Sequence, residues 1–406
     1  MSRGLTLATL SKYPPYRSGH AQQALWNNRA LARITGNVQH QVTYCGTSHD
    51  PRDHAGNEVL VHHVGRTAQN RRAVDGHLVK AMSAELVRVC LDFEVDALLT
   101  YYVDPHAGAA NRAARALARY GKRPAVVHSI EGSDVLNSIC EHVDDKQAAL
   151  LIADFLDADV LCSVSRYTAD RFVRAVESSY GGQVAEAAAK RIHIRYPGLP
   201  DVAFTPPARR TRDSDLASLG LDPQRPIVSS IGRLSPEKGN TLVVDVAEFA
   251  LFEKSPVQFV IAGSGEIDPE LKRRREKLPN LFVMNDVSST SLHSLRAAST
   301  AALLPTREVP GFTETFCISA LEYAALGVPV LATRLGGVPE AVPDDDFLAE
   351  TTSLPSEWWA RLKRTLARRE YMGEVARAFA RSFDDTASAS RIIELTTTSL
   401  VERESA

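Results

Sequence analysis

Short apolar runs alternate with longer amphipathic stretches along most of this 406-residue chain. Runs such as Val160–Ser163 have the length of buried strands, whereas stretches such as Val74–Phe93 repeat apolar residues at helical spacing. This alternation is typical of a parallel sheet covered by helices. In the first half we expect strands at 5–10, 41–45, 59–64, 97–100, 125–129, 160–163 and 192–194, and helices at 21–33, 74–93, 107–120 and 147–156.

The pattern stops over residues 195–213 and then restarts. This segment, RYPGLPDVAFTPPARRTRD, is rich in proline and arginine and lacks periodicity, which predicts a linker. Beyond it we expect strands at 227–231, 258–262, 281–284, 301–304 and 330–332, helices at 241–252, 270–277, 289–298 and 318–326, and a closing helical pair at 356–382 and 385–401.

The restart and the chain length both predict two domains, because a single hydrophobic core stops growing beyond about 250–300 residues. We expect an α/β protein with two Rossmann-like, doubly wound domains that face a cleft. The first domain would cover 1–205 and the second 206–384, with the last helix, 385–401, packed back on the first. A ligand would bind at the carboxyl ends of the strands and in the cleft.

Composition and charge narrow the class of protein. The chain is 44% apolar and 24% charged, and its 47 basic and 49 acidic residues give a net charge of -2, which does not favour nucleic-acid binding. Apolar runs are too short for a membrane span or a signal peptide. Five scattered cysteines without metal spacing indicate reduced thiols, so we expect a cytoplasmic protein. The sequence does not indicate an oligomeric state.

Four glycine-rich turns in the second half follow predicted strands or precede predicted helices. GRLSPEKG (232–239) places Arg233 and Lys238 between two glycines, beginning with Gly232, and AGSGE contains Gly263 and Gly265. PGFTETF (310–316) leads into a helix, and LGGVPEAV (335–342) is a further turn. Any one of these could be an ordinary solvated turn. Together they favour a nucleoside diphosphate site, because glycine lets backbone N–H groups approach an anion and a helix N-terminus attracts one.

Two carboxylates, Glu314 and Glu322, belong to the same region. If the residues between them are helical, eight steps span about 12 Å. Glycosidase carboxyl pairs lie about 5 Å apart in retaining enzymes and about 6.5–9.5 Å apart in inverting ones. The spacing therefore favours contacts with two ends of one extended ligand over a hydrolytic pair. The alternative is one solvated helix glutamate and one loop glutamate.

These motifs resemble a known family. GRLSPEKG, AGSGE and the two glutamates of ETFCISALEYAALGVPVLATRLGGVPEAV are similar to those of the retaining nucleotide-sugar glycosyltransferases of family 4, which have the GT-B fold. Motif order and spacing agree over residues 227–343. Over 1–205 the resemblance is looser and is limited to segments such as SIEGSD (129–134) and IRYPGLPDVAF (194–204).

The resemblance implies roles for individual residues. Arg233 and Lys238 would pair with the donor diphosphate, Glu322 would bind the ribose hydroxyls, and Glu314 would contact the donor sugar near its anomeric carbon. Gly19 would allow the first domain to approach the diphosphate, and the base would pack near Met284–Val287, with Val287 among its contacts. The backbone that would hold the distal phosphate and the sugar hydroxyls belongs to Thr315, Phe316, Cys317 and Ile318.

Two departures from the family pattern leave the sugar contacts in the first half open. Many relatives carry a histidine just before Gly-x-Asp, where this chain has Glu131, and His128 lies three residues earlier. Either is a candidate for the sugar contact, and His106 in YYVDPHAG is a third candidate or a structural histidine. The double glycine of the first loop is Gly19–His20 here, so that His20 is a candidate for contact with phosphate or acceptor.

The activity that the resemblance implies is transfer of a sugar from a nucleoside diphosphate sugar to an acceptor, with retention and by front-face attack. We expect no cofactor and no metal, because the cations and the helix N-terminus balance the leaving-group charge. UDP is favoured over GDP on family frequency alone. The acceptor, a small molecule or a glycan, and its attacking atom are open. The alternatives are a GT-B-fold sugar-nucleotide epimerase or phosphorylase-like enzyme, and a non-catalytic nucleotide-sugar-binding protein.

Overall fold

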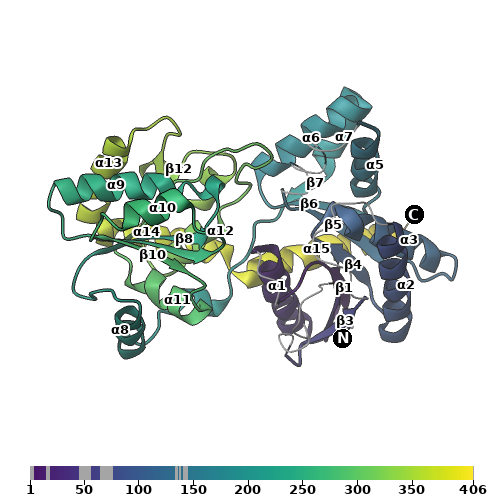
Figure 1. The fold of residues 1–406 in the computed structure, drawn as a ribbon. Helices are drawn as coiled ribbons and strands as arrows, with labels where there is room; N and C mark the ends of the chain where they lie inside the picture. Colours follow the sequence, from purple (N-terminus) through teal and green to yellow (C-terminus); the bar gives the residue numbers. More distant parts are fainter. Residues whose placement is uncertain are drawn as a thin grey trace. The chain divides into compact units, whose positions relative to one another are not determined.

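The computed structural model describes residues 4–14, 19–44, 56–64, 76–132, 136, 139 and 145–405. The chain divides into two compact units (Figure 1). The first unit consists of Met1–Pro200 and Asp384–Ala406, and the second of Asp201–Phe383. Each unit contains one sheet, and all strand pairs found in the described residues are parallel within these sheets.

The sheet of the first unit has seven strands in the order β3-β2-β1-β4-β5-β6-β7. Its strands are β1 (Leu7–Leu10), β2 (Gln39–Thr43), β3 (Val59–His63), β4 (Ala97–Thr100), β5 (Ala125–Ile130), β6 (Val160–Ser163) and β7 (Ile192–Ile194). The helices are α1 (Gly19–Thr35), α2 (Gly76–Phe93), α3 (Gly108–Ala118), α5 (Asp145–Leu156), α6 (Arg166–Tyr180), α7 (Gly182–Arg191) and α15 (Asp385–Glu404), with a π-helical turn η2 (Val103–Ala107).

Alternate residues of the central strands pack on opposite faces of this sheet. Leu7 and Leu99 pack in the cluster that includes residues of α1 and α15, whereas Ala8 and Leu98 pack in the cluster that includes residues of α2 and α3. A parallel strand covered on both faces has no polar side, which explains why these strands appear as continuous apolar runs in the sequence.

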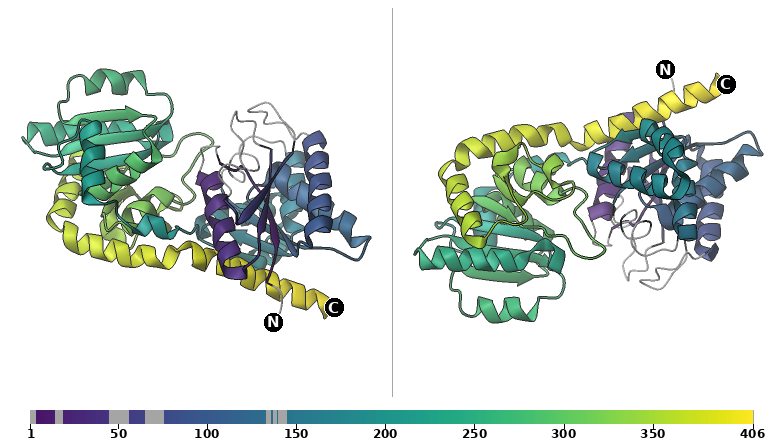
Figure 2. Two further views of the ribbon diagram at one scale, coloured as in Figure 1. Left: turned by 90° about the horizontal axis from the view of Figure 1, so that it is seen from below. Right: turned by 90° about the horizontal axis from the view of Figure 1, so that it is seen from above.

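Helix α15 lies alongside α1 within the first unit (Figure 2). Ala389 and Ile392 are fully buried in the same core cluster as the α1 residue Leu31. Near its end, Arg403 forms an ion pair with Asp159, at 3.8 Å. The final helix is therefore part of the core of the first unit.

The second unit has a six-stranded sheet in the order β10-β9-β8-β11-β12-β13, which is the 3-2-1-4-5-6 order of a Rossmann fold. Its strands are β8 (Ile227–Arg233), β9 (Gln258–Ser264), β10 (Leu281–Asn285), β11 (Ala301–Leu304), β12 (Val330–Thr333) and β13 (Leu348–Ala349). Its helices are α8 (Arg209–Ser218), α9 (Asn240–Phe252), α10 (Pro269–Arg275), α11 (Ser289–Ala298), α12 (Ile318–Ala325), α13 (Pro355–Ala367) and α14 (Arg369–Ala380). Short helical turns are η4 (Asp201–Phe204), η5 (Pro236–Lys238), η6 (Val338–Ala341), η7 (Asp345–Phe347) and η8 (Arg381–Phe383).

The strand order reverses between β8 and β11, and α9 and α11 lie on opposite faces of the sheet (Figure 1). Doubly wound sheets bind ligands at such a switch point, outside the carboxyl ends of the strands. The expected fold class of two doubly wound α/β units is confirmed.

The linker prediction over 195–213 is wrong at both ends. Arg195 is buried against Glu131, and α8 already begins at Arg209. Helices α6 and α7 occupy 166–191, where no helix is expected from the sequence. Their alanines and valines repeat at helical spacing, but many charges between them hide the apolar face.

No helix among the described residues is both long and apolar enough to cross a membrane. Cys90, Cys162 and Cys317 are free thiols buried in the two units, whereas Cys45 and Cys140 lie outside the described residues.

Candidate functional site

The turn after β8 requires glycine at position 239. Gly239 has a φ of +65° and immediately precedes α9. A Cβ atom there would lie 1.8 Å from the carbonyl oxygen of Pro305, in the loop after β11. The β8 turn and the β11 loop therefore meet at the switch point, and any larger residue would separate them.

The glycines of AGSGE bring the ends of β8 and β9 together. Gly263 pairs with Gly232 in the parallel ladder, and a Cβ atom at position 263 would lie 1.6 Å from the carbonyl oxygen of Gly232. Gly265 has a φ of +132° and lies against the backbone of Leu234. The close approach of two backbones accounts for Gly263 without any ligand.

The two predicted cations lie at one aromatic ring. The guanidinium carbon of Arg233 and the ammonium nitrogen of Lys238 are each 5.5 Å from the centroid of the Phe312 ring. Arg233 forms an ion pair with Glu237 at 2.9 Å, and Lys238 forms one with Glu314. The side chain of Arg233 is 57% exposed, whereas that of Lys238 is 22% exposed.

A tight turn presents Phe312 to these cations. The backbone N–H groups of Val309 and Phe312 each donate to the carbonyl oxygen of the other residue, at 3.1 and 2.9 Å. Gly311, within the turn, has a φ of +79°, which favours glycine. Sequence reasoning missed Phe312, although an aromatic residue two positions before a candidate glutamate is a usable signal.

The Lys238–Glu314 pair keeps the ammonium group charged. Burial alone would lower the pKa of Lys238, but the adjacent Glu314 carboxylate outweighs burial and raises it. Cys317 belongs to the same cluster: burial raises the pKa of its thiol to about 12, with smaller effects from Glu314, Lys238 and Glu322. The thiol is therefore neutral, and the charges at the β8 turn are those of Arg233 and Lys238 with their partners Glu237 and Glu314.

Helix α12 begins at Ile318, so that Glu314 lies in the preceding loop and Glu322 in the helix. The spacing calculated for a continuous helix between them does not apply. Thr315 and Phe316 precede the first turn, and Cys317 occupies the N-cap position without a side-chain hydrogen bond to the helix. The N–H groups of Ile318 and Ala320 donate to the carbonyl oxygens of Phe316 and Cys317, at 3.2 and 3.0 Å. The positive end of the helix dipole at this start attracts an anion.

The fourth glycine turn supports the loop of Glu314. The N–H group of Gly337 donates to the Glu314 carbonyl oxygen at 2.9 Å. Cβ atoms at Gly336 and Gly337 would lie 2.2 and 1.9 Å from the carbonyl oxygens of Glu314 and Thr315. These glycines therefore position the loop.

Glu322 forms an ion pair with a residue that sequence reasoning missed. Oε2 of Glu322 lies 2.8 Å from Nη2 of Arg296, on α11. The guanidinium carbon of Arg296 is 5.8 Å from the centroid of the Tyr323 ring. No sequence motif marks Arg296, because its partner is 26 positions away on another helix.

A cavity of about 540 Å³ lies beside the β8 turn, between that turn and the segment 264–271. Arg233 and Gly265 line it, together with Thr241 at the start of α9, but Lys238, Glu314 and Glu322 do not. Val287 is half-buried just after β10. It does not line the cavity, although Val283 does.

The first unit contains the remaining candidates. Gly19 is exposed at the start of α1, and the side chain of His20 lies outside the described residues. Glu131, after β5, forms a buried ion pair with Arg195 at 3.2 Å and accepts a hydrogen bond from Ser129 at 2.6 Å. Arg195 also donates to Ser388 of α15, at 2.9 Å. The Glu131 carboxylate thus belongs to a network of polar contacts that connects the ends of β5 and β7 to α15.

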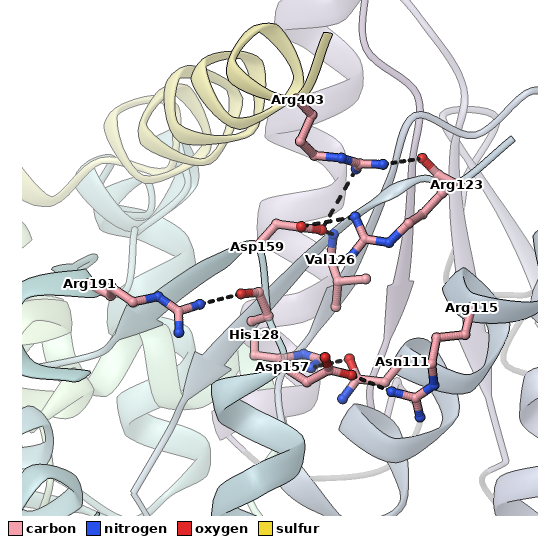
Figure 3. A network of polar contacts seen from close by, with 10 residues as sticks. Asn111, Arg115, Arg123, Val126, His128, Asp157, Asp159, Arg191 and Arg403 are labelled. Carbon is pink, nitrogen blue, oxygen red and sulfur yellow. Dashed lines mark hydrogen bonds and ion pairs between the residues drawn. The ribbon is translucent and has the colours of Figure 1, made fainter. Parts of the chain in front are cut away.

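His128 is fully buried within β5, and both of its ring nitrogens have partners. Nδ1 is 2.8 Å from Oγ1 of Thr100, and Nε2 is 2.9 Å from Oδ1 of Asn111 (Figure 3 shows the latter contact). Burial lowers the pKa of His128 to about 3. This environment favours a structural role over contact with a sugar.

His106, in η2, has a different environment. It is 1% exposed and lies between Tyr44 and Tyr102, with ring centroids 5.5 and 5.6 Å away. Neither ring nitrogen has a hydrogen-bond partner among the described residues. Burial, assisted by the charge of Lys12, lowers the pKa of His106 to about 3.

Buried neutral histidines predict a loss of stability in mild acid. The unfolded chain takes up a proton at His128 near pH 6.5, whereas the folded chain does so only near pH 3. Between these values the unfolded state binds more protons, so that the free energy of unfolding falls by about 1.4 kcal/mol per pH unit as the pH is lowered. In His128→Gln, the decrease between about pH 7 and about pH 5 should be smaller by about 2 kcal/mol in urea unfolding. An unchanged pH dependence would contradict the assignment.

Three Asp-x-Asp strings occur in the sequence, at 157–159, 213–215 and 344–346, and each contains a carboxylate paired with arginine. Asp157 pairs with Arg115 and Asp159 with Arg123, and Asp346 pairs with Arg368. Within the described ranges, no group of three histidine, cysteine or carboxylate residues has an arrangement that could hold a metal ion.

Comparison with known proteins adds a family relation for the second unit. Residues 211–379 match the model of the family Glycosyl transferases group 1. A D-inositol 3-phosphate glycosyltransferase of Segniliparus rotundus is 28% identical over 213 residues, which are 50% of this chain and 45% of that protein. A GDP-mannose-dependent monoacylated alpha-(1-6)-phosphatidylinositol monomannoside mannosyltransferase of Corynebacterium glutamicum is 28% identical over 232 residues, 55% of this chain and 57% of that protein. These matches span about half of each relative.

The fold likeness extends over almost the whole chain. A glycosyltransferase from Rickettsia africae superposes with a TM-score of 0.74 at 14% identity, covering 98% of this chain and 99% of that one. The expected GT-B fold class is thereby confirmed.

Proposed function

We propose that the protein is a retaining glycosyltransferase of family 4 that transfers a sugar from a nucleoside diphosphate sugar to an acceptor. One observation carries the proposal: Arg233 and Lys238 meet at Phe312 at the β8 end, beside Glu314 and the loop that enters α12. Two cations and a helix start at a Rossmann switch point form a diphosphate site, and the adjacent carboxylate suits the hydroxyls of a sugar.

The mechanism follows from where charge develops. The bond between the anomeric carbon and the β-phosphate oxygen breaks, and the attacking atom of the acceptor forms its bond to that carbon on the same face. The acceptor proton passes to the departing phosphate oxygen, so that no side chain becomes covalently attached. Lys238 and Arg233 stabilise the diphosphate charge as it grows, which removes the need for a metal. Glu314 holds the sugar by its hydroxyls and holds Lys238 in place before the donor binds.

In this proposal Glu322 binds the ribose, Gly19 admits the diphosphate, and the N–H groups of Thr315–Ile318 hold the distal phosphate. The first unit binds the acceptor. Of the three candidates there for sugar contact, we favour His106, because Glu131 and His128 have buried internal partners. The base packs near Val287.

Two observations favour different bases for the donor. Family frequency favours UDP, whereas the mannosyltransferase relative is GDP-mannose-dependent. A thermal-shift panel of UDP, GDP and ADP and their sugars tests the proposal, because a ligand that binds only the folded state raises the melting temperature. Stabilisation by none of them would contradict it. Incubation of the best donor without acceptor should give no epimerised sugar.

The two glutamates should differ in the ligand that they recognise. Glu322→Ala should weaken a nucleoside diphosphate and its sugar equally, by about tenfold to a hundredfold, the effect of a hydrogen bond to a charged group. Glu314→Gln, which keeps an oxygen for Lys238, should weaken only the intact donor. Calorimetric titration of both ligands measures this, with the exposed Glu276→Gln as the matched control. The reverse pattern would overturn the assignment.

A further inference from the structure

Helix α11 contributes a side chain to the site that lies outside every motif. Arg296 is 14% exposed and its partner Glu322 is 23% exposed, so that their ion pair is largely withdrawn from water. Pairs of this kind are screened less than surface ion pairs, and they fix the side chains that form them.

The ion pair uses one side of the carboxylate. Nη2 of Arg296 lies 2.8 Å from Oε2 of Glu322. Oε1 has no protein partner among the described residues, and it is not among the buried unpaired atoms. One carboxylate oxygen is therefore held by the protein, and the other is open to a ligand.

The guanidinium group of Arg296 packs against an aromatic ring. It lies over the ring of Tyr323, whose hydroxyl is 2.6 Å from Oγ of Ser229 on β8. Ser229 is in turn 2.6 Å from Ser299, which donates to the backbone of α11 at Leu295. Buried hydrogen bonds thus connect Ser229 of β8 to Tyr323, whose ring lies under the guanidinium group of Arg296.

The pair is also close enough to Lys238 and Glu314 to share an electrostatic neighbour with them. The charges of Glu322 and Glu314 raise the pKa of the Cys317 thiol, and the charge of Lys238 lowers it. Nε of Arg296 is buried and has no partner among the described residues. A guanidinium serving only to join two helices would be expected to satisfy its buried donors.

We propose that Arg296 is a positioning residue for the ribose of the donor: it fixes Oε2 of Glu322 so that Oε1 accepts hydrogen bonds from a ribose hydroxyl. This inference rests on the proposed function, because it requires a nucleoside diphosphate at the cluster. A carboxylate fixed in advance loses less conformational entropy when the ribose binds.

The test compares ribose with deoxyribose. The nucleoside diphosphate that binds most tightly among UDP, GDP and ADP is titrated by calorimetry, together with its 2′-deoxy and 3′-deoxy forms. Wild type should bind at least one deoxy form about tenfold more weakly. Arg296→Met should weaken the ribonucleotide about tenfold while binding that deoxy form within about twofold of wild type. The double variant with Glu322→Gln should be no weaker than the weaker single variant, because both act on one contact.

Arg296→Lys provides a second variant that retains the charge, and it should recover part of the preference for ribose. Equal weakening of ribo and deoxy ligands in Arg296→Met would show a purely structural role and overturn the inference. An unchanged affinity for the ribonucleotide, or no ribose preference in wild type, would overturn it too. Failure of all three nucleoside diphosphates to bind wild type would instead remove the proposed function, so that the two failures are distinguishable.

Discussion

Replacing Lys238 with methionine is expected to weaken nucleoside diphosphate binding by about tenfold to a hundredfold. The Lys238 side chain is only 22% exposed and remains charged beside Glu314. Arg233, in contrast, is 57% exposed and paired with Glu237, and Arg307, which lines the cavity with Arg233, is also exposed. Loss of one charge-assisted hydrogen bond accounts for about 1.5–3 kcal/mol. Calorimetric titration with the preferred nucleoside diphosphate measures the change.

The same substitution leaves Glu314 without its cation, which should cost about 1–3 kcal/mol of stability. The double variant Lys238→Met/Glu314→Gln removes both charges and should regain most of that stability without regaining nucleotide affinity. This separates ligand contact from folding. Lys277→Met, at an exposed position after α10, is the matched control. Restored nucleotide binding in the double variant would show that Lys238 acts only through the fold.

A methyl group at position 263 is expected to destabilise the second unit far more than one at position 232. The two glycines are partners in the β8–β9 ladder, but a Cβ atom at Gly263 would lie 1.6 Å from the Gly232 carbonyl oxygen, whereas one at Gly232 meets nothing within 4 Å. Because the obstacle is backbone, the strands must separate. Overpacking of this kind costs about 1–3 kcal/mol, occasionally more.

The measurement is urea unfolding of Gly263→Ala and Gly232→Ala. Gly263→Ala should lose about 3 kcal/mol, and Gly232→Ala less than about 1 kcal/mol. Equal losses would mean that the close approach of β8 to β9 is not what requires glycine at position 263, and would contradict the packing described above.

The sequence predicts most strands of both sheets because central strands such as β4, β6 and β11 are fully buried and form short apolar runs. Ala97–Thr100, Val160–Ser163 and Ala301–Leu304 have the expected bounds. Helices α6, α7 and α8 escape prediction because charged and polar residues on their exposed faces separate the apolar positions that mark the helical period.

The candidate site is predicted only where its residues lie in one local motif. Arg233 and Lys238 are close in sequence, and the glycine turn that brings them together is visible. The partners that set their charge state and orientation are remote: Glu314 is 76 positions from Lys238, and Arg296 is on a different helix from Glu322. Side-chain geometry of this kind depends on tertiary packing, which local patterns do not contain.

The first unit shows the opposite difficulty. His128 and Glu131 stand near a family motif and invite a ligand role, yet burial and internal partners occupy both. His106 lies in an unremarkable segment, but neither of its buried ring nitrogens has a hydrogen-bond partner within the part of the chain that the structure describes. A motif gives the position of a side chain in the sequence. Whether that side chain can contact a ligand depends on its neighbours in the fold.

The most direct test of the central claim is a calorimetric titration, in excess EDTA, of wild-type protein with a nucleoside monophosphate, the diphosphate and the diphosphate sugar of one base. A site built from Arg233, Lys238 and the α12 start predicts that the diphosphate binds at least about tenfold more tightly than the monophosphate, with or without EDTA. The sugar should add affinity that Glu314→Gln removes. Equal binding of mono- and diphosphate, or binding abolished by EDTA, would contradict a metal-independent diphosphate-sugar site.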